Sequence, residues 1–563
     1  MKKNSKRLLS ALLSLLMLFC AVTPAFAADG WNNNGSQIPI VHIFGDGTAL
    51  YDKDGNKLLE YRELLGTIGK DNGTDSEKTE EEKEREKELY KSVANVVLPF
   101  LIEGLGTGNY DNYYSALQKE IGELFSGILL DKNGNNSNGS GISQENKNTM
   151  EYWLTHDQKK GKGYYGLFDY IFWYDWRLDP LETAEELHTF IAGIKESTGA
   201  KKVSIAARCL GSSVATAYVA KYGTEDIHAI AFNGGVVNGA EILSETISGK
   251  FCLDGNAVNR FLIDCNGYGL FNVDTFINET IDMLSKAGVF EVISGVTKET
   301  IYYTVVKGVT SALALSTFFT FPSYWAAVKS EDYETAKEYV FGKEGSEKRR
   351  EYAGLIAKLD NYDKKVRQKI PEIMNEINDS GNLAVIAKYG SQIVPVIESR
   401  NELADQFATV KSASYGATTS DIYSTLSDDY ITQRISEGKG KYISPDKQID
   451  ASTCLFPDQT WFVKGVKHSN WTNTENDIIY AILKAENQLT VEDSPLSQFI
   501  VYDNETKKGA AMTQENCNTY FWTANEKADK PESPAARLMF FLFSFLKWLK
   551  SAFERLSSSA SKK

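Results

Sequence analysis

The chain has 563 residues, a net charge of −14 and 42% hydrophobic residues. The acidic balance, with no basic cluster that interleaves with aromatic residues, argues against nucleic acid as a partner. The length exceeds that of a minimal single-core protein and indicates one large elaborated domain or two.

Residues 1–27 have the layout of a secretory signal peptide. A basic start, Met1–Arg7, precedes an apolar run from Leu8 to Val22 and the small-x-small sequence Ala25-Phe26-Ala27. The apolar run is shorter than the roughly 20 residues that a bilayer span requires, which favours cleavage over a membrane anchor. We therefore predict a secreted, extracellular protein whose mature chain begins at residue 28.

The cysteines leave one odd thiol. Of six cysteines, Cys20 lies in the predicted signal peptide, so five remain. An exported protein with an odd number has a leftover thiol, and Cys209 is the natural candidate. The other four could form two disulfides or stay reduced; they are Cys252, Cys265, Cys454 and Cys517.

The mature chain opens with a β-branched run, 38–44, that ends at Gly45-Asp46-Gly47. In acyl-transfer hydrolases an early strand and its loop supply one backbone N–H to the oxyanion, which here would be that of Asp46. A plain strand and turn fit the same residues. From about 52 to 163 the composition becomes charged and then rich in Asn, Gly and Ser, which predicts a helical and loop insertion.

The next core strand is expected at 167–173. It leads directly into Tyr174-Asp175-Trp176-Arg177, where Asp175 and Arg177 would form either a charge pair near the active edge or a structural ion pair. Residues 181–197 then have helical apolar spacing.

The stretch 203–220 predicts a nucleophile elbow. An apolar strand pattern meets Ala207-Arg208-Cys209-Leu210-Gly211 and then a helix pattern. Small residues flank the turn because strand and helix backbones pass close together there. Cys209 would project at a helix N-terminus, which favours an anion. A buried, inert cysteine is the alternative.

Strand, helix, strand and helix in succession predict an α/β fold with a mostly parallel sheet wrapped by helices. A further strand is expected near 227–232. Between about 240 and 440 helical patterns dominate, so we expect a large, mainly helical cap inserted over the binding site. The sheet pattern returns at 442–453 and 460–471.

The last third of the chain offers an acid and a base. Asp446 follows a strand pattern, and His468 comes about twenty residues later on a loop. Among the five histidines, only His468 follows both other members of a Cys–Asp–His order on a loop. Asp450 is the alternative acid.

Together these pieces resemble the α/β-hydrolase superfamily, in particular the branch of lipases and lecithin:cholesterol acyltransferase. The resemblance rests on Phe44-Gly45-Asp46-Gly47, Tyr174-Asp175-Trp176-Arg177, Ala207-Arg208-Cys209-Leu210-Gly211, and Asp446 with His468 in chain order. It covers the core strands and neither insertion. Cys209 stands where the family usually has Ser, and Arg208 where it usually has His.

The resemblance implies a hydrolase domain over 28–530 that acts on an acyl ester, with Cys209 as nucleophile, His468 as base and Asp446 as acid. The N–H groups of Asp46 and Leu210 would form the oxyanion hole, with Gly45 and Gly47 as supporting residues, and Arg208 would favour the thiolate of Cys209. A small-molecule or lipid acyl substrate is expected, and neither a cofactor nor a metal. The alternative is a decayed hydrolase scaffold that serves as an extracellular binding protein.

Residues 531–563 are expected to form an amphipathic helix and a polar tail. Polar residues recur at helical spacing at Ser544, Lys547, Ser551 and Glu554 among aromatic neighbours. The stretch is too short and too charged to span a bilayer, so it would lie on a membrane surface or a partner, or dock onto the protein itself.

Overall fold

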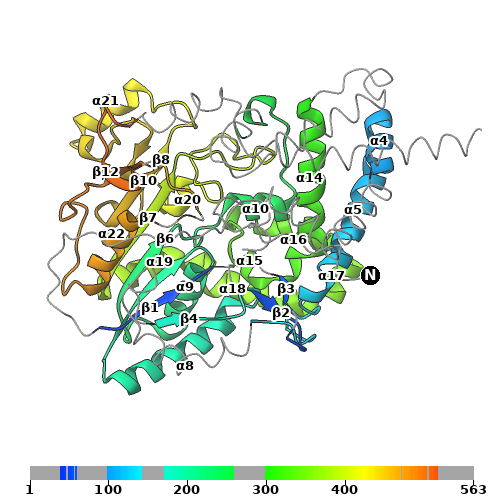
Figure 1. Cartoon of the computed structure of the whole chain (residues 1–563), viewed down its shortest axis with the longest axis horizontal. Coiled ribbons are helices and arrows are strands. Elements are labelled where there is room, and N and C mark those ends of the chain that lie inside the picture. The colour runs from blue at the N-terminus through cyan, green and yellow to red at the C-terminus, as the bar shows by residue number, and fades with distance from the viewer. Residues whose placement is uncertain are drawn as a thin grey trace, which may run out of the picture.

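The computed structural model describes residues 38–45, 49–55, 57–59, 98–142, 170–258, 261, 298–468, 470, 472–503 and 506–517 (Figure 1). The predicted signal peptide, the C-terminal helix, Asp46, Gly47 and Cys265 lie outside these residues.

An eight-stranded sheet forms the centre of the molecule, in the order β12-β11-β10-β7-β6-β5-β1-β4. All neighbouring strands run parallel except β11 and β12. The strands are β1 (Ile40–Ile43), β4 (Tyr170–Phe172), β5 (Val203–Arg208), β6 (Ile227–Asn233), β7 (Asn382–Tyr389), β10 (Thr460–Lys464), β11 (Phe499–Asp503) and β12 (Lys508–Ala511). The central strands are buried and apolar, as expected for a parallel sheet covered on both faces.

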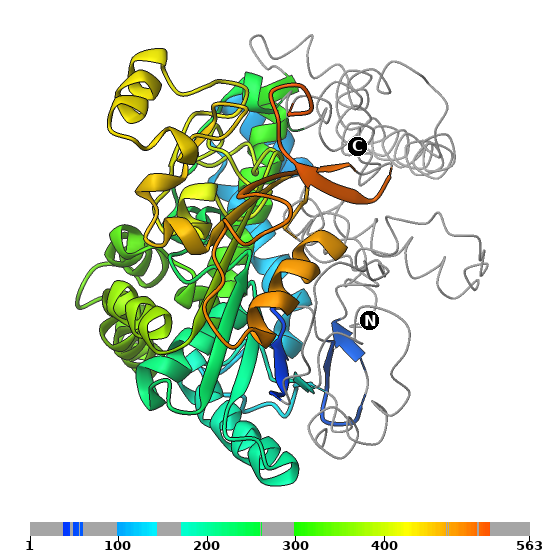
Figure 2. The same cartoon turned by 90° about the vertical axis from the view of Figure 1, so that its left-hand side faces the viewer.

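Helices cover both faces of this sheet (Figure 2). On one face α22 (Asn473–Lys484) packs its apolar side against alternate residues of the strands. It begins at a capping box between Thr472 and Glu475, and the Ser204 hydroxyl of β5 donates to the carbonyl of Leu483 near its end (2.7 Å). The other face is covered by α8 (Pro180–Thr198), α9 (Gly211–Tyr222) and α19 (Ile370–Ser380).

Two insertions are mainly helical. In the first, α4 (Leu98–Thr107) leads into α5 (Asp111–Leu124), and in the second α14 (Lys298–Ser316) lies beside α5 (Figure 1). The second also contains α10 (Glu241–Ser248), α15 (Pro322–Ala326), α16 (Tyr333–Phe341), α17 (Glu347–Glu351) and α18 (Ala353–Lys365). The expected α/β class with helical insertions is therefore confirmed. None of the described helices is both long and apolar enough to cross a bilayer.

The extent of the second insertion differs from the prediction. A core strand, β7, lies inside the predicted cap range of 240–440 and pairs with both β6 and β10. Its apolar centre, Leu383–Ala387, is short and follows a long series of helices, so its periodicity did not stand out. Conversely, the strand pattern at 442–453 yields only β9 (Ile449–Asp450), which pairs with β8 (Thr418–Thr419) outside the main sheet.

Short elements complete the region after β7 and the early chain. They are β2 (Leu50–Tyr51), β3 (Lys57–Leu59), α20 (Val410–Ala413) and α21 (Asp428–Ser436).

Candidate active site

Cys209 occupies the turn between β5 and α9, in a left-handed backbone conformation with φ of 50°. This conformation is unfavourable for a residue with a β-carbon and is typical of strained functional turns. The hydroxyl of Ser212 donates to the Cys209 carbonyl (2.5 Å) and accepts from the N–H of Val236 (2.9 Å), which fixes the turn to the loop after β6. The predicted strand–turn–helix geometry around Cys209 is present.

Two glycines let the backbone close tightly around this turn. A β-carbon on Gly211 would lie 2.3 Å from the carbonyl oxygen of Ile43, so only glycine fits where α9 passes the end of β1. A β-carbon on Gly45 would lie 2.8 Å from Cβ and 3.1 Å from Sγ of Cys209. The loop after β1 therefore passes directly over the thiol.

The same loop lies beside a backbone donor. The position of a β-carbon on Gly45 is 3.4 Å from the nitrogen of Leu210, the residue after Cys209. The Tyr174 hydroxyl donates to the carbonyl of Phe44 (2.6 Å) and holds the loop in place. The N–H of Leu210, one of the two predicted oxyanion donors, thus lies beside the loop after β1, and the other predicted donor, Asp46, lies outside the described residues.

His468 follows β10 and is oriented by a carboxylate that the sequence analysis did not select. Its Nδ1 lies 2.7 Å from Oδ2 of Asp405, and both side chains are 1% exposed. The other carboxylate oxygen of Asp405 accepts from the backbone N–H groups of Phe407 and Ala408 (both 3.0 Å). Burial alone would raise the pKa of Asp405, but the His468 ring and the Lys388 ammonium hold it below its ordinary value.

The elbow and the His468–Asp405 pair meet at the carboxyl edge of the sheet. Arg208, the last residue of β5, pairs in register with Asn233 at the end of β6. A β-carbon on the next residue, Gly234, would lie 3.4 Å from Nδ1 and Cε1 of His468. The imidazole therefore lies beside the first residue after β6, the strand that neighbours the one ending at the Cys209 turn.

Two buried cations hold the backbone of His468. The guanidinium of Arg208 donates to its carbonyl oxygen (2.6 Å), and the Lys388 ammonium donates to the same oxygen (2.9 Å). Lys388 also contacts the Glu475 carboxylate at 3.4 Å, with both side chains fully buried. Burial lowers the pKa of Lys388, and Glu475 opposes that shift. Arg208, predicted to support the thiolate, contacts the histidine loop.

The structure corrects the choice of acid. Asp446 accepts from the Lys464 ammonium (2.9 Å) and the Tyr389 hydroxyl (2.9 Å), and does not pair with His468. The alternative, Asp450, is bound by Arg434 (2.7 Å) and Tyr430 (2.8 Å). Both carboxylates lie in the segment before β10 and are engaged by structural partners, whereas the loop after β7 brings Asp405 to the imidazole.

Asp175 and Arg177 form a buried ion pair of 2.6 Å after β4. The guanidinium also donates to the Ile128 carbonyl (2.7 Å) and the Ser140 hydroxyl (2.9 Å). The pair therefore fastens the first insertion to the edge of the sheet, which matches the structural alternative in the sequence analysis.

Sequence reasoning missed Asp405 because it missed β7. The signal was present: the run Leu383–Ala387 lies between Gly381 and Gly390, and glycines commonly bound strands. Recognising that strand would have directed the search for the acid to the loop that follows it. The role of Lys388, a charged residue in a buried strand, had no local signal.

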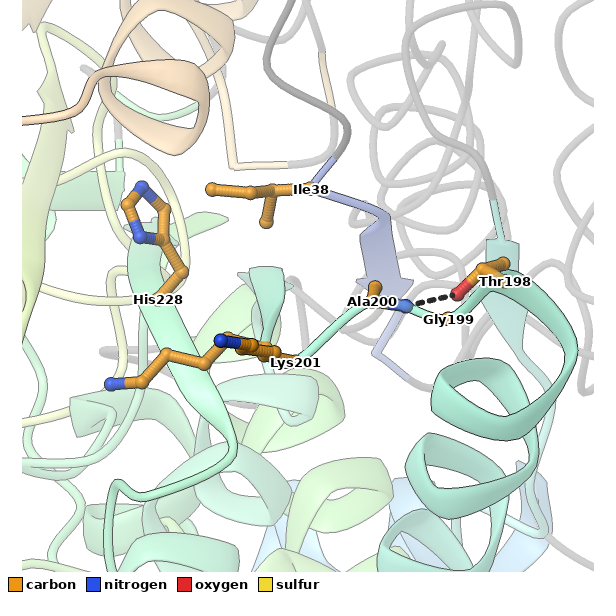
Figure 3. Close-up of a pocket in the computed structure, with 7 residues that line it drawn as sticks. Ile38, Thr198, Gly199, Ala200, Lys201 and His228 are labelled. Atoms are coloured by element: carbon orange, nitrogen blue, oxygen red, sulfur yellow. Dashed lines mark hydrogen bonds between the residues drawn. The ribbon is translucent and has the colours of Figure 1, made fainter.

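A separate cleft of about 330 Å³ lies at the opposite edge of the sheet (Figure 3). Its lining comes from the amino ends of the strands and includes Ile38, Lys201, Lys202 and His228. Lys202 donates to the Ile227 carbonyl (3.1 Å), and Nε2 of His228 lies 2.8 Å from the Ala485 carbonyl. The cleft is remote from Cys209, and the side chains of Lys202 and His228 are engaged in the fold.

No family model matches the chain, and no curated protein sequence matches it. Among solved structures, the crystal structure of the Tle4–Tli4 complex is similar over 62% of this chain and 75% of that chain, with 11% identity and a TM-score of 0.22. The α/β class of this chain is shown by its own mostly parallel sheet.

Proposed function

We propose that the protein is an acyl hydrolase or acyltransferase of the α/β-hydrolase type, with Cys209, His468 and Asp405 as its triad. The observation that carries the proposal is the buried His468–Asp405 pair at the end of the strand next to the one that carries Cys209, a cysteine held at φ of 50° on a strand-to-helix turn. A nucleophile, a base and a group that orients the base are the parts that nucleophilic acyl transfer requires.

The chemistry follows from these positions. Nδ1 of His468 is engaged by Asp405, so Nε2 takes the proton from the Cys209 thiol as sulfur attacks the acyl carbonyl carbon. The N–H of Leu210 stabilises the oxyanion, an interaction worth about 3 kcal/mol. The leaving alkoxide departs with the proton from His468, and a thioester to Cys209 remains. Water or an alcohol then attacks the thioester as His468 removes its proton, and the thiol is regenerated.

The wider setting of this activity is carried over from the sequence. We propose that the protein is exported through residues 1–27, that its substrate is a small-molecule or lipid acyl ester, and that residues 531–563 associate with a membrane surface. Cys209 is only 5% exposed, which supports a site that other parts of the chain cover.

Thiol labelling tests the proposal. A chloroacetamide probe at pH 7 should label Cys209, and His468→Ala should abolish that labelling because the base is lost. Cys454 is the matched control: it is also buried, and burial raises the pKa of its thiol to about 11, so it should stay unlabelled. Peptide mass spectrometry locates the label.

Turnover of a p-nitrophenyl acyl ester provides the second readout. Cys209→Ala should abolish turnover and leave the melting temperature nearly unchanged, whereas Cys454→Ala should leave turnover intact. Labelling of Cys209 that survives His468→Ala, or an absence of turnover by the intact protein on acyl esters and thioesters, would favour the non-catalytic binding protein instead.

A further inference from the structure

Gln406 lies at the tip of the loop that carries the proposed acid. Its neighbours in sequence are Asp405, which pairs with His468, and Phe407, whose ring stacks on the His468 imidazole with centroids 4.6 Å apart. Its backbone has φ of 89°, a left-handed conformation that strongly favours glycine. A glutamine is therefore kept at a strained position beside the base.

The amide of the Gln406 side chain is buried without hydrogen-bond partners among the described residues. It is 2% exposed, and in the described part of the chain neither Oε1 nor Nε2 has a hydrogen-bond partner. The hydroxyl of Ser391 is fully buried and equally unpartnered there, and the backbone of Ser391 bridges Asp405. Buried polar atoms without partners are rare because desolvation is not repaid. Unpartnered buried polar atoms of Gln406 and Ser391 therefore lie beside the proposed acid.

Another buried glutamine shows the contrast. Gln498 is 6% exposed, and its Nε2 donates to the carbonyls of Pro457 (2.6 Å) and Thr460 (2.9 Å). Its amide stabilises the fold, while that of Gln406 stabilises nothing in the described residues. The two side chains therefore form a matched pair for a test.

We propose that Gln406 is a specificity-determining residue that hydrogen-bonds an amide in the acyl part of the substrate. The inference rests on the proposed function, because it places the substrate's acyl group at Cys209 and His468. The carboxamide of Gln406 offers an N–H donor and a carbonyl acceptor, and an amide in the substrate can pair with either one. A plain alkyl chain would leave Oε1 and Nε2 unpaired, so it should be the poorer substrate.

Two p-nitrophenyl esters of equal chain length test this: the N-acetylglycyl ester, which carries an amide, and the pentanoyl ester, which does not. The readout is kcat/KM for the N-acetylglycyl ester divided by kcat/KM for the pentanoyl ester. Comparing this ratio between each variant and the intact protein removes the difference in intrinsic reactivity of the two esters. We expect Gln406→Met to lower the ratio at least tenfold, and Gln498→Met to leave it unchanged.

Melting temperatures give an independent readout that needs no turnover. Gln406→Met should leave the melting temperature unchanged or raise it, since methionine removes an unpaired buried amide, whereas Gln498→Met should lower it. An unchanged ratio in Gln406→Met with esterase activity present overturns this inference and leaves the proposed function standing. Loss of stability in Gln406→Met as large as in Gln498→Met also overturns it. Absence of turnover by the intact protein overturns both.

Discussion

Asp405 and Asp446 are two buried carboxylates near the carboxyl ends of neighbouring strands, yet their surroundings give them different roles. Asp405 faces the imidazole of His468, the proposed base. Asp446 faces the ammonium of Lys464 and the hydroxyl of Tyr389. A carboxylate that pairs with a buried lysine stabilises the fold, whereas a carboxylate that binds a histidine can orient that histidine as a base. The partner, more than the carboxylate itself, separates the two roles.

Asp405→Asn should produce the largest effect. The amide would still fill the site but would no longer stabilise the imidazolium or its tautomer, so kcat/KM for an acyl ester should fall by about 10³- to 10⁴-fold. Asp446→Asn is the control and should keep kcat/KM within about threefold at a temperature where it is folded. Equal losses of kcat/KM in the two variants would contradict the different roles given to Asp405 and Asp446.

Asp446→Asn should instead show its effect in stability. Removing its charge leaves the Lys464 ammonium buried beside a neutral amide, so the free energy of unfolding should fall by about 3 kcal/mol. Urea denaturation followed by tryptophan fluorescence measures this. A loss below about 1 kcal/mol would mean that the buried pair contributes little to the fold.

The double variant Lys388→Met with Glu475→Gln tests whether Lys388 positions the loop of His468, the partner of Asp405. The double change removes both members of the buried pair, so no charge is stranded, but the His468 carbonyl loses one of its two cationic donors. We expect kcat to fall about tenfold to a hundredfold, with a smaller stability loss than in Lys388→Met alone. Unchanged kcat in the double variant would show that Arg208 alone holds the histidine loop.

Glu245→Gln should give the smallest effect, and one that depends on pH. Burial raises the pKa of Glu245 from 4.5 to about 7, while its hydrogen bonds from Ser399 in the loop before Asp405 oppose the shift. The native state holds this proton more tightly than the unfolded state, so the stability of the protein falls as pH rises from about 4.5 to about 7.

The glutamine variant lacks that titration but can still accept from the Ser399 N–H. Its unfolding free energy relative to the intact protein should therefore improve by about 1–2 kcal/mol between pH 5 and pH 8. Denaturation curves at those two pH values measure the difference, and parallel pH profiles for both proteins would contradict it.

The residues of the candidate site differ in how far the sequence alone could predict them. The elbow was predictable because the strand, the turn and the helix all lie within residues 203–222. The small residues Ala207 and Gly211 on either side of Cys209 indicate a tight turn without any information from distant parts of the chain. His468 could be selected because histidines are few. The choice of Asp446 failed because Asp405 and His468 are 63 residues apart, and their meeting depends on β7 pairing with β10. No local pattern near Asp446 indicates that Lys464 will engage it.

The α22 contacts described above also bear on how the protein folds. The hydrogen bond from Ser204 to Leu483 joins residues 279 positions apart, and His468 precedes the helix that makes it. Pairings over such separations form slowly, because the chain loses the entropy of closing a long loop before the stabilising contacts form. In refolding from urea, we therefore expect the far-ultraviolet circular dichroism signal to return before esterase activity, with the recovery of activity reporting the closure of the sheet between β7 and β10.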